Sequence, residues 1–254
     1  MAGPRRHLDS VSLPGQLLRS PWGRTNHRGR QVSLLAGPAV ALGAGLLTPV
    51  PYALPLAVLA AVVGRYDDVA GDRPEQRADK GLAGHLRALG ERRISSGTVK
   101  ALVLPVAGLL AAAARADARS WPQLWCDALL IASAANTVNL LDVAPGRALK
   151  ATLAVLFAAA ALPPVRRAGL GLAVVAAAAM PADLAERTML GDCGANALGA
   201  LLGLCLAADR RWAVRLPALS ACVAVTLAAE RVSLSAVIAR QPALARLDAW
   251  GRPA

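Results

Sequence analysis

The stretch MLGDCGANALGALLGLCLAA, residues 189–208, shows most directly what kind of fold this chain forms. From Cys193 to Ala208 it has no charged side chain and consists mainly of Ala, Leu and Gly. An apolar run of roughly 17–25 residues is typical of a helix that crosses a bilayer, so flanking residues must extend this one or the bilayer must thin. Asp192 stands directly before the run. The stretch predicts a membrane-spanning helix with a carboxylate at its beginning.

Seven further apolar blocks lie on either side of this stretch. Together they predict an all-α polytopic membrane protein with about eight transmembrane helices. The predicted spans are Leu34–Pro49, Pro51–Val63, Val99–Ala113, Leu124–Leu141, Leu149–Pro163, Ala168–Pro181, Cys193–Ala208 and Val214–Ala229. The alternative is a soluble protein with a very apolar helical core. It is disfavoured because buried soluble helices rarely follow one another in such number without a polar face.

Composition supports the membrane interpretation. Apolar residues make up 56% of the chain and charged residues 17%, against averages of about 45–50% and about 25% in soluble proteins. This apolar content excludes a disordered chain. The net charge of +12 would favour nucleic-acid binding on a soluble fold, but with aromatics at 3% no nucleic-acid partner is expected. The four cysteines show no CxxC pairing and are interpreted as small apolar side chains.

The basic residues predict the orientation. With the N-terminus placed in the cytoplasm and eight spans, 21 of the 28 Lys and Arg residues fall in inside segments and seven outside. Cytoplasmic loops carry such an excess of positive charge, so we expect a multi-pass plasma-membrane protein with both termini cytoplasmic. Three regions follow: a basic arm over residues 1–31, a transmembrane domain over 32–230 and a basic tail over 231–254.

Polar residues that could carry chemistry gather where predicted spans meet the cytoplasm. They are Asp67 and Asp68 after the second span, Asn136, Asn139 and Asp142 at the end of the fourth, and Asp192 at the start of the seventh. The spacing of three within the second group places its side chains on one helix face. Such a stripe is costly in lipid and must face protein, water or an ion.

Several carboxylates at one membrane depth, among basic residues, point to metal-assisted phosphate chemistry. Mg²⁺ takes carboxylate and amide oxygens and keeps waters and substrate phosphates as its other ligands, and phosphoryl transfer needs such a metal together with positive charge. The 64–100 loop supplies cations. Gly191 and Asp192 open a helix, whose free backbone N–H groups favour phosphate. We therefore expect Mg²⁺ as the cofactor and catalytic loops on the cytoplasmic side.

These motifs carry a family resemblance. GRYDDVAGD (64–72), DKGLAGHLRAL (79–89), NTVNLLD (136–142) and MLGDCGANALGALLG (189–203) resemble, in order and spacing, the polyprenyl-phosphate N-acetylhexosamine-1-phosphate transferases. The similarity covers roughly residues 37–230. It implies a membrane enzyme for cell-envelope glycan synthesis, in which polyprenyl phosphate attacks the sugar-bound phosphate of a UDP-N-acetylhexosamine. UMP is released, and a lipid-linked pyrophosphoryl sugar forms.

The resemblance also implies roles for individual residues. Asp67 and Asp68 match the paired aspartates that handle the lipid phosphate and the metal, and Asp192 matches the Mg²⁺-binding aspartate. The implied catalytic residues are Asp67, Asp68 and Asp192, with Asp68 and Asp192 as metal ligands. The implied substrate-binding residues are Asn136, Asn139 and Asp142 on the nucleotide side, with Lys80 or Arg87 as a pyrophosphate contact.

The chain departs from the family pattern in two places. Pro145 stands where the family has a second aspartate that helps to read the nucleobase, and the segment after Glu230 lacks the family's His-rich motif. Arg231 or Arg240 could replace the missing His as a phosphate contact, because Arg binds phosphate well although it cannot act as an acid or base near neutral pH. His85 is interpreted as a surface side chain of a basic loop.

Three functions stay open on the sequence. The first is an active phosphoglycosyltransferase with an altered donor pocket. The second is a non-catalytic relative that binds polyprenyl phosphate or an envelope-assembly partner, and the third is an unrelated transporter with an acidic ion site. The identity of the sugar and the lipid stays open, as does the oligomeric state, for which a homodimer is one possibility.

Overall fold

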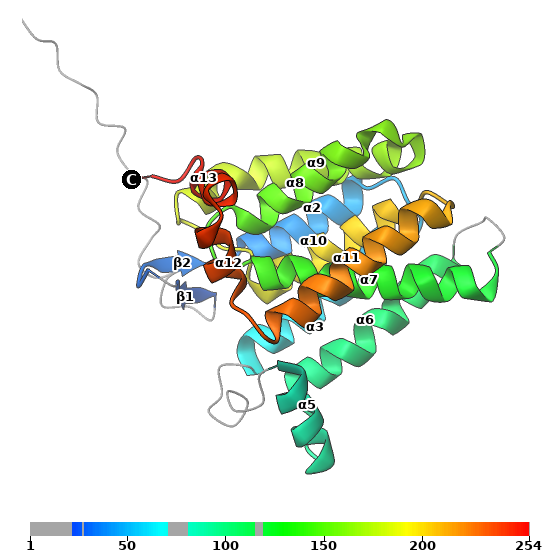
Figure 1. Ribbon diagram of the computed structural model, residues 1–254, viewed down its shortest axis with the longest axis horizontal. Coiled ribbons are helices and arrows are strands. Elements are labelled where there is room, and N and C mark those ends of the chain that lie inside the picture. The colour runs from blue at the N-terminus through cyan, green and yellow to red at the C-terminus, as the bar shows by residue number, and fades with distance from the viewer. Residues whose placement is uncertain (1–21, 27, 71–80, 115–118, 254) are drawn as a thin grey trace, which may run out of the picture.

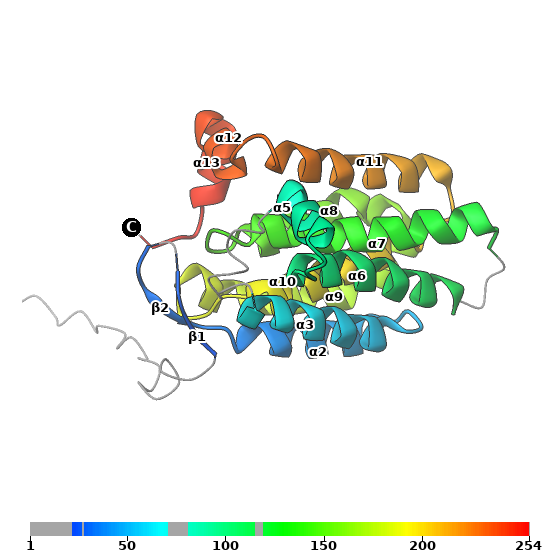
Figure 2. The same ribbon diagram turned by 90° about the horizontal axis from the view of Figure 1, so that it is seen from below.

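The computed structural model describes residues 22–26, 28–70, 81–114 and 119–253. Eight of its helices each overlap one predicted span, and they lie side by side in a bundle (Figures 1 and 2). They are α2 (Ala36–Leu47), α3 (Ala53–Ala70), α6 (Ser96–Ala113), α7 (Trp121–Leu141), α8 (Arg147–Ala158), α9 (Pro163–Leu184), α10 (Gly191–Leu206) and α11 (Trp212–Ala229).

The described residues form six shorter elements as well. These are β1 (Gly23–Thr25), β2 (Gln31–Ser33), α5 (Gly81–Gly90), the 3-10 turn η1 (Ala159–Ala161), α12 (Leu234–Arg240) and α13 (Pro242–Ala249). The antiparallel hairpin β1–β2, in register Gly23 to Ser33, is a small exception to the all-α expectation. The expected 64–100 loop also contains more helix than predicted, because α3 continues to Ala70 and α6 begins at Ser96. Asp67, Asp68 and Lys100 therefore lie on helices.

Four of the eight bundle helices are both long and apolar enough to cross a membrane: α6, α7, α9 and α11. Helices α2 and α10 are apolar but shorter. The architecture therefore supports an all-α membrane protein and a location in a membrane, with four helices that meet both criteria rather than the eight predicted spans.

Helix α10 is the centre of the bundle. Every one of its residues is buried except Asp192, and it packs against α2, α3, α7 and α9. Small residues permit the close approach: a Cβ at Gly199 or Gly203 would press against the backbone of α7. Small residues at helix contacts are typical of membrane bundles, where close packing drives association.

The motif-bearing helix termini meet at one end of the bundle. The carboxylate of Asp68, near the end of α3, accepts hydrogen bonds from the first backbone N–H groups of α10, and Gly146, before α8, donates to Asp183 at the end of α9. At the opposite end, Arg119 and Arg215 form ion pairs with Asp127, and all three side chains are at most 1% exposed. The bundle thus has a charged cluster at each end.

Candidate functional site

The site begins where α3 approaches α10. Gly64 of the GRYDD motif lies against the first turn of α10, and a Cβ there would overlap the carbonyl oxygen of Asp192. This approach brings the last two turns of α3, with Asp67 and Asp68, beside the beginning of α10. The glycine of the motif therefore positions the aspartates that follow it.

A cluster of four polar side chains forms beside this contact. Lys100 Nζ, in the first turns of α6, lies 2.9 Å from Asp67 Oδ2 and 3.5 Å from Asp192 Oδ2. With its amide oriented to satisfy both neighbours, Asn139 donates to Asp192 Oδ1 at 3.0 Å and accepts from Lys100 Nζ at 3.1 Å. We call Asp67, Lys100, Asn139 and Asp192 the Lys100 cluster. It joins residues from α3, α6, α7 and α10.

The cluster is enclosed but accessible. The side chain of Asp192 is 28% exposed, and those of Asp67 and Lys100 are 15% and 13% exposed. Partial burial strengthens the interaction of these charges relative to water. The cluster can therefore present two carboxylates, an amide and an ammonium group to a molecule that approaches from this end of the bundle.

Asp68 has a different environment from Asp67. Its oxygens accept from the backbone N–H groups of Asp192 and Cys193, each at 3.1 Å, and Oδ1 also accepts from Arg24 Nη1 at 2.9 Å. A carboxylate at a helix N-terminus is stabilised by the orphan N–H groups and by the helix dipole. Asp68 therefore caps α10 and ties it to the β1 strand.

Asp142 lies close to the beginning of α10. It ends α7 and is 8% exposed, and its carboxylate lies near the backbone N–H of Gly191. The start of α10 was expected to offer free N–H groups to a phosphate. That expectation is wrong for this conformation, because the buried carboxylate of Asp68 already takes the N–H groups of Asp192 and Cys193.

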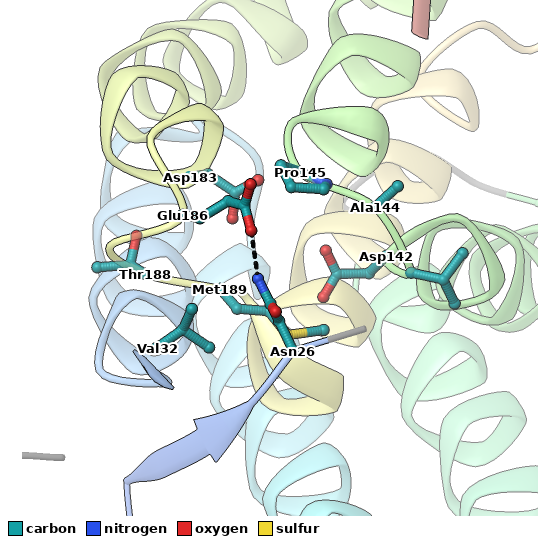
Figure 3. Close-up of a pocket in the computed structure, with 10 residues that line it drawn as sticks. Asn26, Val32, Asp142, Ala144, Pro145, Asp183, Glu186, Thr188 and Met189 are labelled. Atoms are coloured by element: carbon teal, nitrogen blue, oxygen red, sulfur yellow. Dashed lines mark hydrogen bonds between the residues drawn. The ribbon is translucent and has the colours of Figure 1, made fainter. Parts of the chain in front are cut away.

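A small pocket adjoins Asp142, with a volume of about 40 Å³. Figure 3 shows Asp142, Asp183 and Glu186 around it, together with Asn26, which donates to Glu186 Oε2 at 2.6 Å. Among the described residues, Asp142 Oδ2 has no hydrogen-bond partner. Pro145, the residue that departs from the family motif, also lines the pocket.

The structure separates the predicted polar stripe of α7. Asn139 joins the Lys100 cluster and Asp142 meets α10, but Asn136 donates to Thr226 Oγ1 of α11 at 3.0 Å. A spacing of three residues turns a helix by less than one full turn, so the three side chains meet different neighbours. Asn136 thus contributes to the packing of α7 on α11.

The remaining predicted contacts lie apart from these bonds or outside the described residues. Arg87, Arg231 and Arg240 are exposed, and Lys80 lies outside the described residues. His85 was expected on the surface of a loop, and this is wrong. It lies half-buried on α5, and its Nδ1 shares a 2.8 Å hydrogen bond with Ser95 Oγ at the start of α6.

The Lys100 cluster contains oxygen donors of the kind that Mg²⁺ takes. In the described part of the chain, no three His, Cys, Asp or Glu side chains form a group that could hold a metal ion. Mg²⁺ is, however, usually bound through one or two carboxylates with waters and substrate phosphates as its other ligands. Asp67, Asp192 and the Asn139 amide are hard oxygen donors that already surround one cation, the Lys100 ammonium. The residues present therefore fit the ion, with Asp192 as a predicted ligand and Asp67 in place of Asp68.

Two site residues were missed on the sequence. Lys100 was counted among the loop cations, and Arg24 among the charges of the N-terminal arm. The signal for Lys100 was available: it directly adjoins the apolar run Val99–Ala113, and an ionisable residue at a span is a functional candidate by default. Arg24 carried no such signal, since its contact with Asp68 joins residues 44 positions apart.

Comparison with known proteins gave no relative for this chain. No family model matches it, and neither a curated protein nor a solved structure is detectably similar.

Proposed function

We propose that the protein is an integral membrane phosphoglycosyltransferase. It moves an N-acetylhexosamine-1-phosphate-type group from a UDP-sugar to polyprenyl phosphate, as an Mg²⁺-dependent step of cell-envelope glycan synthesis. The observation that carries the proposal is the Lys100 cluster, where Asp67, Asn139 and Asp192 converge on one cation. Three motifs far apart in the sequence, each resembling the same family, thereby contribute to one cluster.

In the reaction, the sugar phosphate exchanges its phosphoanhydride bond to UMP for one to the lipid phosphate. An oxygen of the lipid phosphate attacks the phosphorus bonded to the sugar, a new P–O bond forms, and the bond to the uridylyl phosphate breaks so that UMP leaves. Positioning and charge stabilisation dominate the catalysis of such steps. Lys100 supplies a positive charge for a phosphate oxygen, and Asn139 orients both Lys100 and Asp192.

Mg²⁺, when bound, would neutralise charge on the pyrophosphate that changes hands. Asp67, Asp192 and the amide oxygen of Asn139 would hold it. Asp68 serves this arrangement indirectly, because it fixes the first turn of α10 that carries Asp192. We place this end of the bundle in the cytoplasm, as the charge count predicts, with all eight bundle helices crossing the membrane.

Arg231 is the residue we assign to the donor phosphate. It follows Glu230, whose carboxylate lies next to Gly81 at the start of α5, the helix that continues the segment after Asp68. Arg231→Ala should raise the KM for the UDP-sugar at least tenfold and change the KM for the lipid little. A KM for the UDP-sugar that stays within twofold of wild type would remove Arg231 from the donor site.

The proposal is tested by UMP release from the full-length protein in nanodiscs with polyprenyl phosphate, Mg²⁺ and a panel of UDP-N-acetylhexosamines. We expect release that depends on Mg²⁺ and falls at least about 100-fold in Asp67→Asn, because groups that stabilise developing charge typically contribute several kcal/mol. Glu91→Gln is the matched control, since Glu91 is an exposed carboxylate that, among the described residues, pairs with Arg93 two positions away. If no UDP-N-acetylhexosamine supports UMP release, the proposal that the protein is an enzyme is overturned.

A non-catalytic relative that binds polyprenyl phosphate is the second candidate. It is favoured by one observation: the N–H groups of Asp192 and Cys193 at the start of α10, which could bind a donor phosphate, are taken by Asp68. Binding of polyprenyl phosphate without turnover of any UDP-sugar would establish this candidate in place of the enzyme.

A further inference from the structure

The C-terminal helices α12 and α13 lie where the last bundle helix ends. Helix α11, apolar and long enough to span a membrane, ends at Ala229, and α12 begins at Leu234. Ser233 caps α12 by accepting from the N–H of Ala236 at 3.3 Å. In Figures 1 and 2 the two short helices sit beside the end of the bundle and do not continue α11. The short connection keeps them at the depth where α11 leaves the membrane.

A set of polar contacts fixes these helices to the start of α8. Arg147 donates to both carboxylate oxygens of Asp248, at 2.8 and 2.9 Å, and Lys150 Nζ donates to the carbonyls of Leu247, Asp248 and Trp250. Burial alone would raise the pKa of Asp248, but the hydrogen bonds from Arg147 and Arg252 hold it below its ordinary value. The segment therefore has a defined orientation relative to the bundle.

This orientation leaves large apolar side chains uncovered. Helix α13 turns Ala245 and Asp248 toward its contacts, while Leu244 is 46% exposed, Leu247 62% and Trp250 74%. Leu244 and Leu247 are three residues apart and so share a flank of the helix. A Trp and two Leu side chains at the end of a membrane bundle match the composition of helices that lie in a membrane interface.

Among the described residues of the segment 231–253, the exposed charged side chains are all arginines. Asp248 is the sole acid of residues 231–254, and Arg147 and Arg252 pair with it. Arg240 and Arg246 are exposed. An apolar flank beside exposed arginines is complementary to a bilayer surface with anionic headgroups, to which each nearby Arg contributes about 1 kcal/mol.

We propose that α12 and α13 form an interfacial anchor on the anionic membrane surface. Leu244, Leu247 and Trp250 enter the boundary between headgroups and acyl chains, and Arg240 and Arg246 pair with lipid phosphates. Through Arg252, which donates to the carbonyl of Pro145 at 2.9 Å, the anchor also holds the α7–α8 turn next to Asp142. This function does not depend on catalysis and holds for an enzyme or a lipid-binding relative.

The first test follows trypsin cleavage of the unmodified full-length protein in nanodiscs. The membranes contain phosphatidylcholine alone, or phosphatidylcholine with an equal part of phosphatidylglycerol. We expect cleavage after Arg240 and Arg246 to be about tenfold slower in the anionic nanodiscs, and this protection to disappear at high salt because salt screens exposed charges. Cleavage after Arg92, which is exposed and lies outside α12 and α13, serves as the internal standard for trypsin activity in each membrane. Equal cleavage in both membranes would overturn the proposal.

The second test locates the apolar flank. A fluorophore at Leu247→Cys is compared with one at Ala249→Cys on the other flank of α13, both in a Cys222→Ala background. In anionic nanodiscs, brominated lipid chains should quench the probe at 247 at least twice as strongly as the probe at 249, and Arg240→Gln with Arg246→Gln should reduce this ratio. A probe at 247 that is reached by aqueous iodide, or that is shielded equally in both membranes by protein, would contradict a lipid-facing anchor.

Discussion

The two charged clusters of the bundle use the same residue types for opposite purposes. At one end, Lys100 lies between Asp67 and Asp192, and the Asp192 side chain is 28% exposed. At the other end, Asp127 lies between Arg119 and Arg215, and these side chains are at most 1% exposed. The first cluster can receive a ligand, whereas the second is closed.

The partners of the closed cluster explain its role. Arg119 and Arg215 also donate to the backbone carbonyls of Ala207 and Asp209, just after α10. The triad therefore ties the segment before α7 and the beginning of α11 to the end of α10. At the end of the bundle that holds the Lys100 cluster, Asp68 makes the equivalent tie at the beginning of α10, and Asp67 and Asp192 remain partly exposed beside it. The charges of the closed cluster bind backbone carbonyls and hold the fold, whereas the partly exposed charges of the Lys100 cluster carry the proposed chemistry.

The largest expected effect breaks the closed cluster. Asp127→Asn removes the negative charge between two buried arginines and should lower the free energy of unfolding by about 3–5 kcal/mol, the usual cost of an uncompensated buried charge. Thermal unfolding in detergent measures the loss. Glu91→Gln, at an exposed ion pair, should change the free energy of unfolding by less than about 1 kcal/mol. Equal stability of the two variants would mean that Asp127 is not structural.

The next effect separates activity from stability. Lys100→Met removes the cation of the open cluster and should lower UMP release at least about 100-fold, because a positive charge at a reacting phosphate typically contributes several kcal/mol. Its loss of stability should be smaller than that of Asp127→Asn, since water reaches this cluster. Lys100→Arg should retain part of the rate. A variant that unfolds as readily as Asp127→Asn would make Lys100 a structural residue.

The smallest effect concerns the polar residues of α7. Thr226→Val removes the hydrogen bond to Asn136 and should lower the free energy of unfolding by about 1 kcal/mol, with UMP release per folded protein unchanged. Asn139→Ala should instead reduce UMP release at similar stability, because Asn139 orients Lys100 and Asp192. Similar rates of UMP release in Thr226→Val and Asn139→Ala would contradict the assignment of Asn136 to packing and of Asn139 to chemistry.

The sequence predicted the helices better than their contacts. Each predicted span overlaps a helix, because long apolar blocks decide where helices form, and Gly191 does open α10. The different roles of Asp67 and Asp68 could not be predicted from the sequence, because the two residues are adjacent and chemically identical. The roles depend on the direction in which each side chain leaves α3: Asp68 points to the N-terminus of α10, and Asp67 to Lys100.

The closed cluster shows the same limit. Asp127 lies within the predicted span Leu124–Leu141, and the charge count places Arg119 and Arg215 among the seven basic residues on the outer side. Arg215 and Asp127 are 88 positions apart. Helical periodicity relates only residues that are close in the sequence, so it cannot predict this ion pair. Such partners become visible only once the helices are packed.

The most direct test of the central claim is one variant measured in two ways. Asp192→Asn keeps the shape of this side chain, which is 28% exposed, and removes its charge. The proposed function predicts that UMP release in the presence of polyprenyl phosphate, Mg²⁺ and the accepted UDP-sugar falls at least about 100-fold. The melting temperature should stay close to that of the wild-type protein, since loss of the ion pair with Lys100 is offset by relief of the repulsion from Asp67 and Asp68. UMP release at the wild-type rate, or a loss of activity no greater than the loss of folded protein, would contradict the assignment of the Lys100 cluster as the catalytic site.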